Sequence, residues 1–168
     1  MPAGNCGWGE ASAAAPQLII QNGEVEASVR PQLPDGAPPR TLLYVEDNPA
    51  NMKLVEQLIE RCPGIRLLTA VNGTLGIELA RAAQPEVILM DVNLPGISGI
   101  EALKILREDP ATVHIPVVAL SANAMPRDIA TGLELGFFRY LTKPIKVKEF
   151  MDTLNTALEF AEKRLARN

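Results

Sequence analysis

Ionisable and hydroxyl side chains stand at the ends of short apolar runs in this sequence. The acidic pair Glu46-Asp47 follows one run, Asp91 follows a second, Ser121 follows a third, and Lys143 comes directly after a fourth. Carboxylates gathered in one place repel each other unless a cation lies among them. Carboxylate and carbonyl oxygens suit a hard octahedral ion, and Mg²⁺ commonly shares its ligand shell with a phosphate oxygen. If the runs are neighbouring strands, these residues predict a Mg²⁺ site that handles a phosphoryl group.

The apolar runs have the length and composition of buried strands. Each has five or six residues and is rich in Val, Ile and Leu. Near-continuous apolarity indicates that both faces of a strand are covered, as in a parallel sheet. The predicted strands are Thr41–Val45, Ile65–Ala70, Glu86–Met90, Ile115–Leu120 and Phe138–Thr142.

Segments with helical periodicity alternate with the predicted strands. Asn48 and Pro49 provide an N-cap followed by proline at the first helical position. Ser98 and Glu101 match a capping box, which sets the start of the third helix. The predicted helices are Pro49–Cys62, Thr74–Gln84, Ser98–Asp109, Pro126–Leu135 and Val147–Arg164.

Five strand-helix units in tandem predict a small, doubly wound α/β domain over residues 41–164, followed by a short tail at 165–168. Such a domain has a parallel sheet with helices on both faces and right-handed crossovers. Folds of this class bind ligands at the carboxyl ends of the strands, beside the point where the strand order reverses. The polar residues at the strand ends are therefore predicted to share one site.

Residues 1–40 differ from the rest of the chain in composition. They contain six Pro and five Gly, which disfavours a packed core, and we interpret the segment as a linker. Within it, Asn22-Gly23 lies between partly alternating apolar residues in Leu18–Val25, which is the signal of a short β-hairpin. A hairpin is therefore an alternative for that part of the segment.

Composition excludes several classes of protein. The net charge of −4 provides no electrostatic footprint for nucleic acid, and no apolar run approaches the length of a membrane span. The first basic residue is Arg30, which is not typical of a secretory signal. Cys6 and Cys62 are far apart, and His114 is the single histidine, which argues against structural disulfides and zinc clusters. We expect a cytoplasmic protein with no membrane contact.

The blocks of sequence at the strand ends resemble the receiver domain of two-component response regulators, over Arg40 to about Glu162. The steps of 44, 30 and 22 residues that separate Asp47, Asp91, Ser121 and Lys143 are those of the family. The resemblance implies a flavodoxin-like fold with strand order 2-1-3-4-5. The matching blocks are Glu46-Asp47, Ile88–Gly96, Leu120–Ala124 and Tyr140–Pro144.

The resemblance also implies roles for individual residues. Asp91 would be the phosphoacceptor, attacking a phosphohistidine on a histidine kinase or a histidine phosphotransfer protein. Asp47, Asp91 and the backbone carbonyl of Asn93 would hold Mg²⁺, with Glu46 acting on the ion through water. Lys143 would neutralise the phosphoryl oxygens as a mobile point charge.

Two further residues would report phosphorylation. Ser121 would donate its hydroxyl to a phosphoryl oxygen, and Tyr140 would move inward when Ser121 shifts, which changes the surface of the fourth helix, fifth strand and fifth helix. A buried aromatic residue is more often part of the core, so the core interpretation of Tyr140 stays open. The resemblance further implies a cis peptide between Lys143 and Pro144.

The sequence departs from the family pattern at a few positions. Glu46 replaces the more frequent aspartate, and its extra methylene changes how the first acid reaches the ion. Phe137-Phe138-Arg139 makes the start of the last strand bulkier and more basic than usual. Asn93 and Asn123 flank the path of attacking water and should influence the lifetime of the phosphoryl bond.

The predicted function is that of a signalling phosphoacceptor rather than an enzyme. We expect a downstream protein partner and no nucleic acid, and a phosphorylation-dependent dimer is left open. The Pro-rich segment before Arg40 suggests the C-terminal receiver of a hybrid histidine kinase. The alternatives are a stand-alone regulator and a phosphorylation-independent pseudo-receiver. An aspartyl phosphatase ranks last, because Asn93 stands where such enzymes carry a second aspartate.

Overall fold

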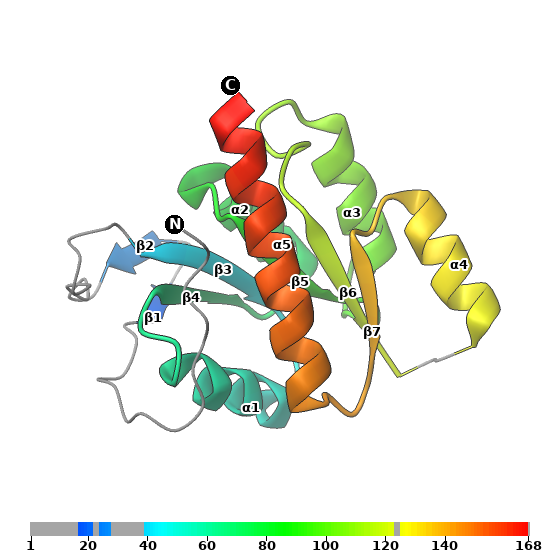
Figure 1. Ribbon diagram of the computed structural model, residues 1–168, viewed down its shortest axis with the longest axis horizontal. Coiled ribbons are helices and arrows are strands. Elements are labelled where there is room, and N and C mark those ends of the chain that lie inside the picture. The colour runs from blue at the N-terminus through cyan, green and yellow to red at the C-terminus, as the bar shows by residue number, and fades with distance from the viewer. Residues whose placement is uncertain (1–16, 22–23, 28–38, 123–124, 168) are drawn as a thin grey trace.

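The structure is a computed structural model that describes residues 17–21, 24–27, 39–122 and 125–167. Strands and helices alternate along most of this part of the chain (Figure 1). The strands are β1 Gln17–Gln21, β2 Glu24–Ala27, β3 Arg40–Val45, β4 Ile65–Ala70, β5 Val87–Asp91, β6 Val117–Ser121 and β7 Arg139–Thr142. The helices are α1 Pro49–Glu60, α2 Gly73–Ala83, α3 Gly99–Glu108, α4 Pro126–Leu135 and α5 Val147–Arg167.

The strands form one sheet in the order β2-β1-β4-β3-β5-β6-β7. From β4 to β7 every neighbouring pair is parallel. Numbered as the five predicted strands, this part of the sheet has the order 2-1-3-4-5, so the predicted doubly wound α/β fold is confirmed. The order reverses between β3 and β5, and that is where ligands bind in folds of this class.

Helices cover both faces of the sheet. Helices α1 and α5 pack on one face, and α2, α3 and α4 pack on the other, with a buried apolar cluster in each layer. In Figure 1, α5 lies in front of the sheet and α2 lies behind it. Successive side chains of a strand point to opposite faces, so Leu42 and Tyr44 join the first cluster, while Leu43 and Val45 join the second.

Two strands extend further than the sequence predicted. Strand β5 ends at Asp91 and β6 ends at Ser121, whereas the predicted strands ended one residue earlier. Hydrogen bonds of the ladder continue to these residues, since Asp91 pairs with Leu120 and Ser121 pairs with Thr142. At the other end β6 starts after Pro116, which has no N–H to donate to a neighbouring strand.

Helices α1 and α3 begin after the predicted capping residues, whereas α1 ends at Glu60, before the predicted Cys62, and α5 continues past the predicted Arg164 to Arg167. The Asn48 side chain accepts a hydrogen bond from the Ala50 N–H at 2.8 Å, and the Ser98 hydroxyl accepts one from the Glu101 N–H at 3.1 Å. These bonds use backbone donors that have no partner inside a helix. No helix in the described residues is both long enough and apolar enough to cross a membrane.

The N-terminal segment adds a hairpin to the edge of the sheet. Strands β1 and β2 pair antiparallel, and β1 runs parallel to β4 through Gln17 and Leu18. The hairpin alternative is therefore confirmed, and the linker interpretation did not include these strands. Asn22-Gly23 and the rest of the Pro/Gly-rich stretch lie outside the described residues. The domain boundary at residue 40 stays a prediction.

Candidate functional site

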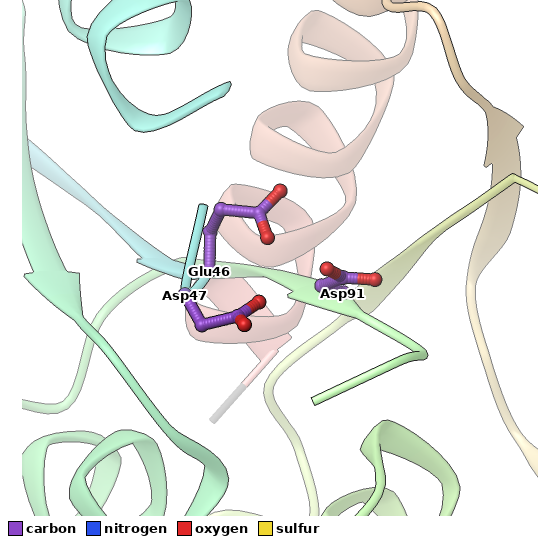
Figure 2. A group of neighbouring side chains, drawn as sticks. All are labelled: Glu46, Asp47 and Asp91. Carbon is purple, nitrogen blue, oxygen red and sulfur yellow. The ribbon is translucent and has the colours of Figure 1, made fainter. Parts of the chain in front are cut away.

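Three carboxylates meet where the order of the sheet reverses. Glu46 and Asp47 directly follow β3, and Asp91 is the last residue of the neighbouring strand β5. One oxygen from each of the three lies within 4.8 Å of the others. Figure 2 shows Glu46 and Asp47 leaving the end of the same strand, with both carboxylates directed to the side where Asp91 stands. The predicted convergence of these residues is thus found in the structure.

The three acids differ in their exposure to solvent. Only 1% of Glu46 and 2% of Asp91 are exposed, whereas Asp47 is exposed. Buried carboxylates are rare unless they are paired or hydrogen-bonded, because burial removes the water that stabilises their charge. The site therefore consists of two buried acids and one acid that faces the solvent.

Lys143 is the cation that pairs with both buried acids. Its Nζ lies 3.0 Å from Asp91 Oδ2 and 3.0 Å from Glu46 Oε1. The backbone holds this lysine in place, since the Lys143 N–H donates to the Ser121 carbonyl at 2.8 Å. The peptide between Lys143 and Pro144 is cis, as predicted.

The pKa values of the two buried acids are shifted in opposite directions. Burial and the neighbouring Glu46 raise the pKa of Asp91 to about 6, although Lys143 opposes this shift. Burial also acts to raise the pKa of Glu46, but hydrogen bonds within the site, with Asp91 and Lys143 foremost, hold that pKa below its usual range. For Lys143, burial acts to lower the pKa, and the two carboxylates outweigh it and raise the pKa. One lysine leaves part of the negative charge uncompensated.

The loop after Asp91 is held close to the acid. The Asn93 N–H donates to Asp91 Oδ1 at 3.0 Å. Gly99, at the start of α3, donates its N–H to the Val92 carbonyl at 2.9 Å. A Cβ atom at Gly99 would collide with the Asp91 carbonyl oxygen and approach Val92 Cα to 2.7 Å. Glycine at this position therefore allows α3 to start directly against the backbone of the acid.

Ser121 and Tyr140 lie on the β6 and β7 side of the site. Ser121 ends β6, the strand next to β5, and is 1% exposed. The half-buried Tyr140 ring packs on α4, where a Cβ at Gly132 would approach it to 2.8 Å. It also meets the buried Phe137 ring edge-on, with centroids 6.4 Å apart. Tyr140 thus contacts the core while remaining partly accessible at α4.

The remaining predicted positions lie around this group. Asn93 is exposed beside Asp91, and Asn123 lies outside the described residues. Phe138 is half-buried, and the exposed Arg139 has its guanidinium carbon 5.1 Å from the centre of the Phe138 ring. Of the bulky, basic segment at the start of β7, Arg139 therefore lies on the surface, whereas Phe137 belongs to the core.

Sequence analysis missed one residue of the site, Tyr44. Its hydroxyl donates a hydrogen bond to Glu46 Oε1 at 3.0 Å. Burial, followed by the charge of Glu46, raises the pKa of Tyr44 well above its usual range, so this hydroxyl is a donor at neutral pH. A period of two along β3 places residues 44 and 46 on one face, which is the signal that could have identified Tyr44.

The donor set of the site fits a hard divalent cation. Carboxylate oxygens are the protein ligands that such ions prefer, and Glu46, Asp47 and Asp91 each bring one to the same place. Their charges outnumber that of Lys143, so a further cation would reduce the repulsion among them. A phosphoryl group bound here would also contact the ammonium group of Lys143. A lysine beside the carboxylate is typical of sites for phosphoryl transfer.

Comparison with known proteins matches the described domain over most of its length. A family model described as the response regulator receiver domain matches residues 42–155. The polar-differentiation response regulator DivK of Brucella anthropi is 41% identical over 120 residues, which cover 71% of this chain and 97% of that protein. DivK of Brucella ovis is 40% identical over 119 residues, covering 71% of this chain and 96% of that protein.

A solved structure with the same fold contains a metal ion. The receiver domain of sensor histidine kinase PA1611 from Pseudomonas aeruginosa, with magnesium coordinated in its active site cleft, is 31% identical and superimposes with a TM-score of 0.65. The match covers 72% of this chain and 98% of that domain. The receiver domain of the Francisella response regulator 1452 is 28% identical, with a TM-score of 0.66 and 71% and 97% coverage.

Proposed function

Because this chain belongs to the response regulator receiver family, we propose that it is the phosphoacceptor of a two-component phosphorelay and that Asp91 takes the phosphoryl group. The observation that carries this proposal is the setting of Asp91. It is a buried carboxylate beside two other acids, and one of its oxygens pairs with Lys143 at 3.0 Å. Burial removes water that would compete for the reacting groups, and pairing with Lys143 keeps a positive charge beside the attacking acid.

The donor is a phosphohistidine on a histidine kinase or a histidine phosphotransfer protein. A carboxylate oxygen of Asp91 attacks the phosphorus, and a P–O bond forms as the P–N bond breaks. The electron pair of the P–N bond returns to the imidazole nitrogen, which takes up a proton. The product is an acyl phosphate on Asp91. Such transfers depend mainly on positioning and on neutralising the phosphoryl oxygens, and Lys143 provides a charge for the second task.

Asp47, Asp91 and the backbone carbonyl of Asn93 would hold Mg²⁺, with Glu46 acting on the ion through water. When bound, Mg²⁺ supplies positive charge that offsets the charge of the phosphoryl oxygens. Two observations support this assignment: the carboxylate oxygens of Glu46, Asp47 and Asp91 lie within 4.8 Å of one another, and the PA1611 receiver domain coordinates magnesium in its cleft. In this chain the acids bring the oxygens together, while Lys143 keeps Asp91 and Glu46 in fixed positions.

Phosphorylation would be read by a downstream protein at the surface formed by α4, β7 and α5. Ser121 would donate its hydroxyl to a phosphoryl oxygen, and Tyr140 would change its packing on α4 in response. The surface is suited to protein contact, because it exposes 45% of Leu133 in α4 and 38% of Val147 in α5. Phosphorylation then shifts an existing equilibrium of the domain and changes its affinity for a partner or for a second copy.

The test is the intact mass of the chain after incubation with a small acyl phosphate. Samples contain Mg²⁺ or a chelator, and the variants are Asp91→Asn and Asp152→Asn. Asp152 is an exposed acid on α5 and serves as the matched control. We expect the wild type and the Asp152 variant to gain one phosphoryl mass with Mg²⁺, and the Asp91 variant to gain none.

The outcomes of this test discriminate between the proposed classes. Mass gain by the Asp91 variant would reject Asp91 as the acceptor. No gain by the wild type, either from the acyl phosphate or from a phosphorylated histidine phosphotransfer protein, would reject phosphoacceptor function and favour a pseudo-receiver. A second readout is the acid and base sensitivity of the modified chain, because an acyl phosphate hydrolyses under conditions that leave a phosphoserine intact.

Two contexts for the domain are proposed. The DivK relatives are matched over nearly their whole length, which favours a stand-alone regulator, and the C-terminal receiver of a hybrid histidine kinase stays a prediction. An immunoblot of extract from the cells that make the protein, probed with an antibody against this domain, decides between the two contexts. A band at the mass of this chain, in the cytoplasmic fraction, identifies a stand-alone regulator, and a much larger band places the domain in a longer protein, as the hybrid-kinase prediction requires.

A further inference from the structure

Tyr44 is a fully buried residue that carries its hydroxyl to the edge of the site. It lies in β3, two residues before Glu46, and 0% of it is exposed. Because side chains along a strand alternate, Tyr44 and Glu46 point to the same face. The hydroxyl of Tyr44 donates to Glu46 Oε1 at 3.0 Å. This bond connects the apolar layer between the sheet and helices α1 and α5 to the acidic site at the carboxyl ends of the strands.

The two oxygens of Glu46 have unequal sets of donors. Oε1 accepts from the Tyr44 hydroxyl and pairs with Lys143 Nζ, both at 3.0 Å. Oε2 accepts a long bond of 3.4 Å from the Asn48 N–H, and the Asp91 carboxyl group also lies within hydrogen-bond reach of the Glu46 carboxylate. The bonds to Oε1 are the shorter ones, and they fix the rotation of the carboxylate. Oε2 therefore faces the acidic side of the site with only a weak backbone donor.

Lys143 shares its ammonium group between Glu46 and Asp91, whereas the Tyr44 hydroxyl donates to Glu46. Lys143 Nζ contacts both Glu46 and Asp91, so a phosphoryl group arriving on Asp91 competes with Glu46 for the ammonium. The Tyr44 hydroxyl has Glu46 as its hydrogen-bond partner in the described part of the chain. When Lys143 turns to the phosphoryl oxygens, Tyr44 is the side-chain donor that stays on Glu46.

We propose that Tyr44 is a positioning residue of the phosphorylation site, whose hydroxyl keeps Glu46 Oε2 directed at the metal ion both before and after Lys143 engages the phosphoryl group. The inference rests on the proposed function of the site. It also accounts for glutamate at position 46. An aspartate would be shorter by one carbon-carbon bond, about 1.5 Å, and its carboxylate would be out of reach of the Tyr44 hydroxyl.

The first experiment compares Mg²⁺ affinity by titration calorimetry of the unphosphorylated full chain. Tyr44→Phe removes the hydroxyl and keeps the ring. The matched control is Thr112→Val, which removes another fully buried hydroxyl, donating to the Leu106 carbonyl at 2.8 Å, outside the acidic site. We expect Tyr44→Phe to weaken Mg²⁺ binding about tenfold, the usual effect of losing an outer-shell partner, and Thr112→Val to leave it unchanged.

A double-mutant cycle shows whether Tyr44 acts through Glu46. Glu46→Asp keeps the charge but separates the carboxylate from the hydroxyl. In that background, Tyr44→Phe should change Mg²⁺ affinity by less than about twofold, because the interaction has already been removed. At saturating Mg²⁺ the phosphorylation rate of Tyr44→Phe should return to within about twofold of wild type, which a loss of folded protein would not allow.

A measurement on the unaltered protein complements the variants. The chain has two tyrosines, so ¹³C labelling of tyrosine Cζ yields two resonances, which Tyr140→Phe assigns. The Tyr44 resonance should shift during a Mg²⁺ titration with the midpoint of binding, since its hydroxyl bonds to a carboxylate that acts on the ion through water.

Several results would overturn the proposal. One is a Mg²⁺ affinity of Tyr44→Phe within about twofold of wild type. Another is an equal loss of Mg²⁺ affinity in Thr112→Val. The third is a Tyr44 resonance whose chemical shift does not change during the Mg²⁺ titration. Each of these would leave the proposed function standing, provided that the wild type still gains the phosphoryl group. A wild type that neither binds Mg²⁺ nor gains a phosphoryl group would reject both.

Discussion

Buried charged side chains have different kinds of partners at the two ends of the sheet. At the carboxyl ends of the strands, Glu46 and Asp91 share the single ammonium of Lys143. At the opposite end, one half-buried cation, Arg107, is surrounded by carbonyl oxygens. Acids outnumber the cation at the first end, whereas acceptors surround the cation at the second.

Three backbone carbonyl oxygens hold the guanidinium at the arginine end. Arg107 Nη1 donates to the Val113 carbonyl at 2.7 Å and to the Ile115 carbonyl at 3.0 Å, and Nη2 donates to the Gly136 carbonyl at 2.9 Å. These bonds join the end of α3 to the segment before β6 and to the end of α4. Burial, followed by repulsion from Arg164, lowers the pKa of Arg107. The guanidinium therefore has a structural role.

The difference shows how a buried charge can be assigned to structure or to function. A charged group whose hydrogen-bond partners are all provided by the fold stabilises that fold. A cluster whose charges do not balance is destabilising on its own, and such clusters are typical of sites that bind ions or substrates. By this criterion the acidic end is the functional end.

The largest effect is expected for Lys143→Met. Removing the ammonium should slow phosphoryl gain by about 100- to 1000-fold, because one charged group that faces the developing charge contributes on that scale. Time courses of intact mass with an acyl phosphate measure the rate. Lys104→Met, at an exposed lysine on α3, is the control and should keep the wild-type rate. A Lys143 variant within about tenfold of wild type would contradict the role of this lysine.

Neutralising Asp91 should stabilise the chain in the absence of metal. The pKa of Asp91 is about 6 in the folded chain and 3.8 without burial, so the folded state binds the extra proton between these values. Stability of the wild type therefore falls as pH rises from about 4 to 6. Asp91→Asn avoids this loss and should be more stable by about 3 kcal/mol at pH 7, with no difference at pH 4. Urea unfolding in chelator measures both.

The control for this prediction is Asp109→Asn, at the arginine end. A hydrogen bond from the Ala111 N–H and then the Arg81 side chain lower the pKa of Asp109, so neutralising it should destabilise the chain at pH 7. Opposite signs at the two ends are expected. If Asp91→Asn were destabilising at pH 7, the acidic end would be balanced without a ligand, and the contrast would fail.

Arg107→Met should affect stability alone. It leaves three carbonyls without their donor and should lower the free energy of unfolding by about 2 kcal/mol, as for a lost bond to a charged group. Arg107→Lys should rescue little, because an ammonium cannot reproduce the planar fork of donors. Urea unfolding measures stability, and intact mass at a temperature where the variant is folded should show unchanged phosphoryl gain. A slower gain would assign a functional role to this end.

The smallest effect is stabilisation by Mg²⁺. At ten times its dissociation constant, a ligand that binds only the folded state contributes about 1.4 kcal/mol. We expect this increase for the wild type and for Arg107→Met in thermal melts with and without Mg²⁺. Asp91→Asn should show a much smaller increase, because a ligand is lost and the repulsion is already relieved. Equal stabilisation of all three would place the ion elsewhere.

Sequence patterns were sufficient to predict the parallel sheet and the group of polar residues at its carboxyl end. Apolar runs alternating with amphipathic segments require strands covered on both faces, and parallel strands bring their ends to one edge. Asp47, Asp91 and Lys143 could therefore be expected at one edge of the sheet, and the resemblance to receiver domains supplied the strand order that brings them together. The last residues of β5 and β6 were placed wrongly, because ladder hydrogen bonds extend those strands to Asp91 and Ser121.

The side chains that complete these groups could be identified only from the packing of the folded chain. The Arg107 bonds reach carbonyls six, eight and 29 residues away, and no local pattern encodes them. The attachment of β1 to β4 joins segments about 50 residues apart. The bond from Tyr44 to Glu46 follows strand alternation, but the reach of the hydroxyl depends on the packing around it. Periodicity places side chains on a face, and packing determines which of them touch.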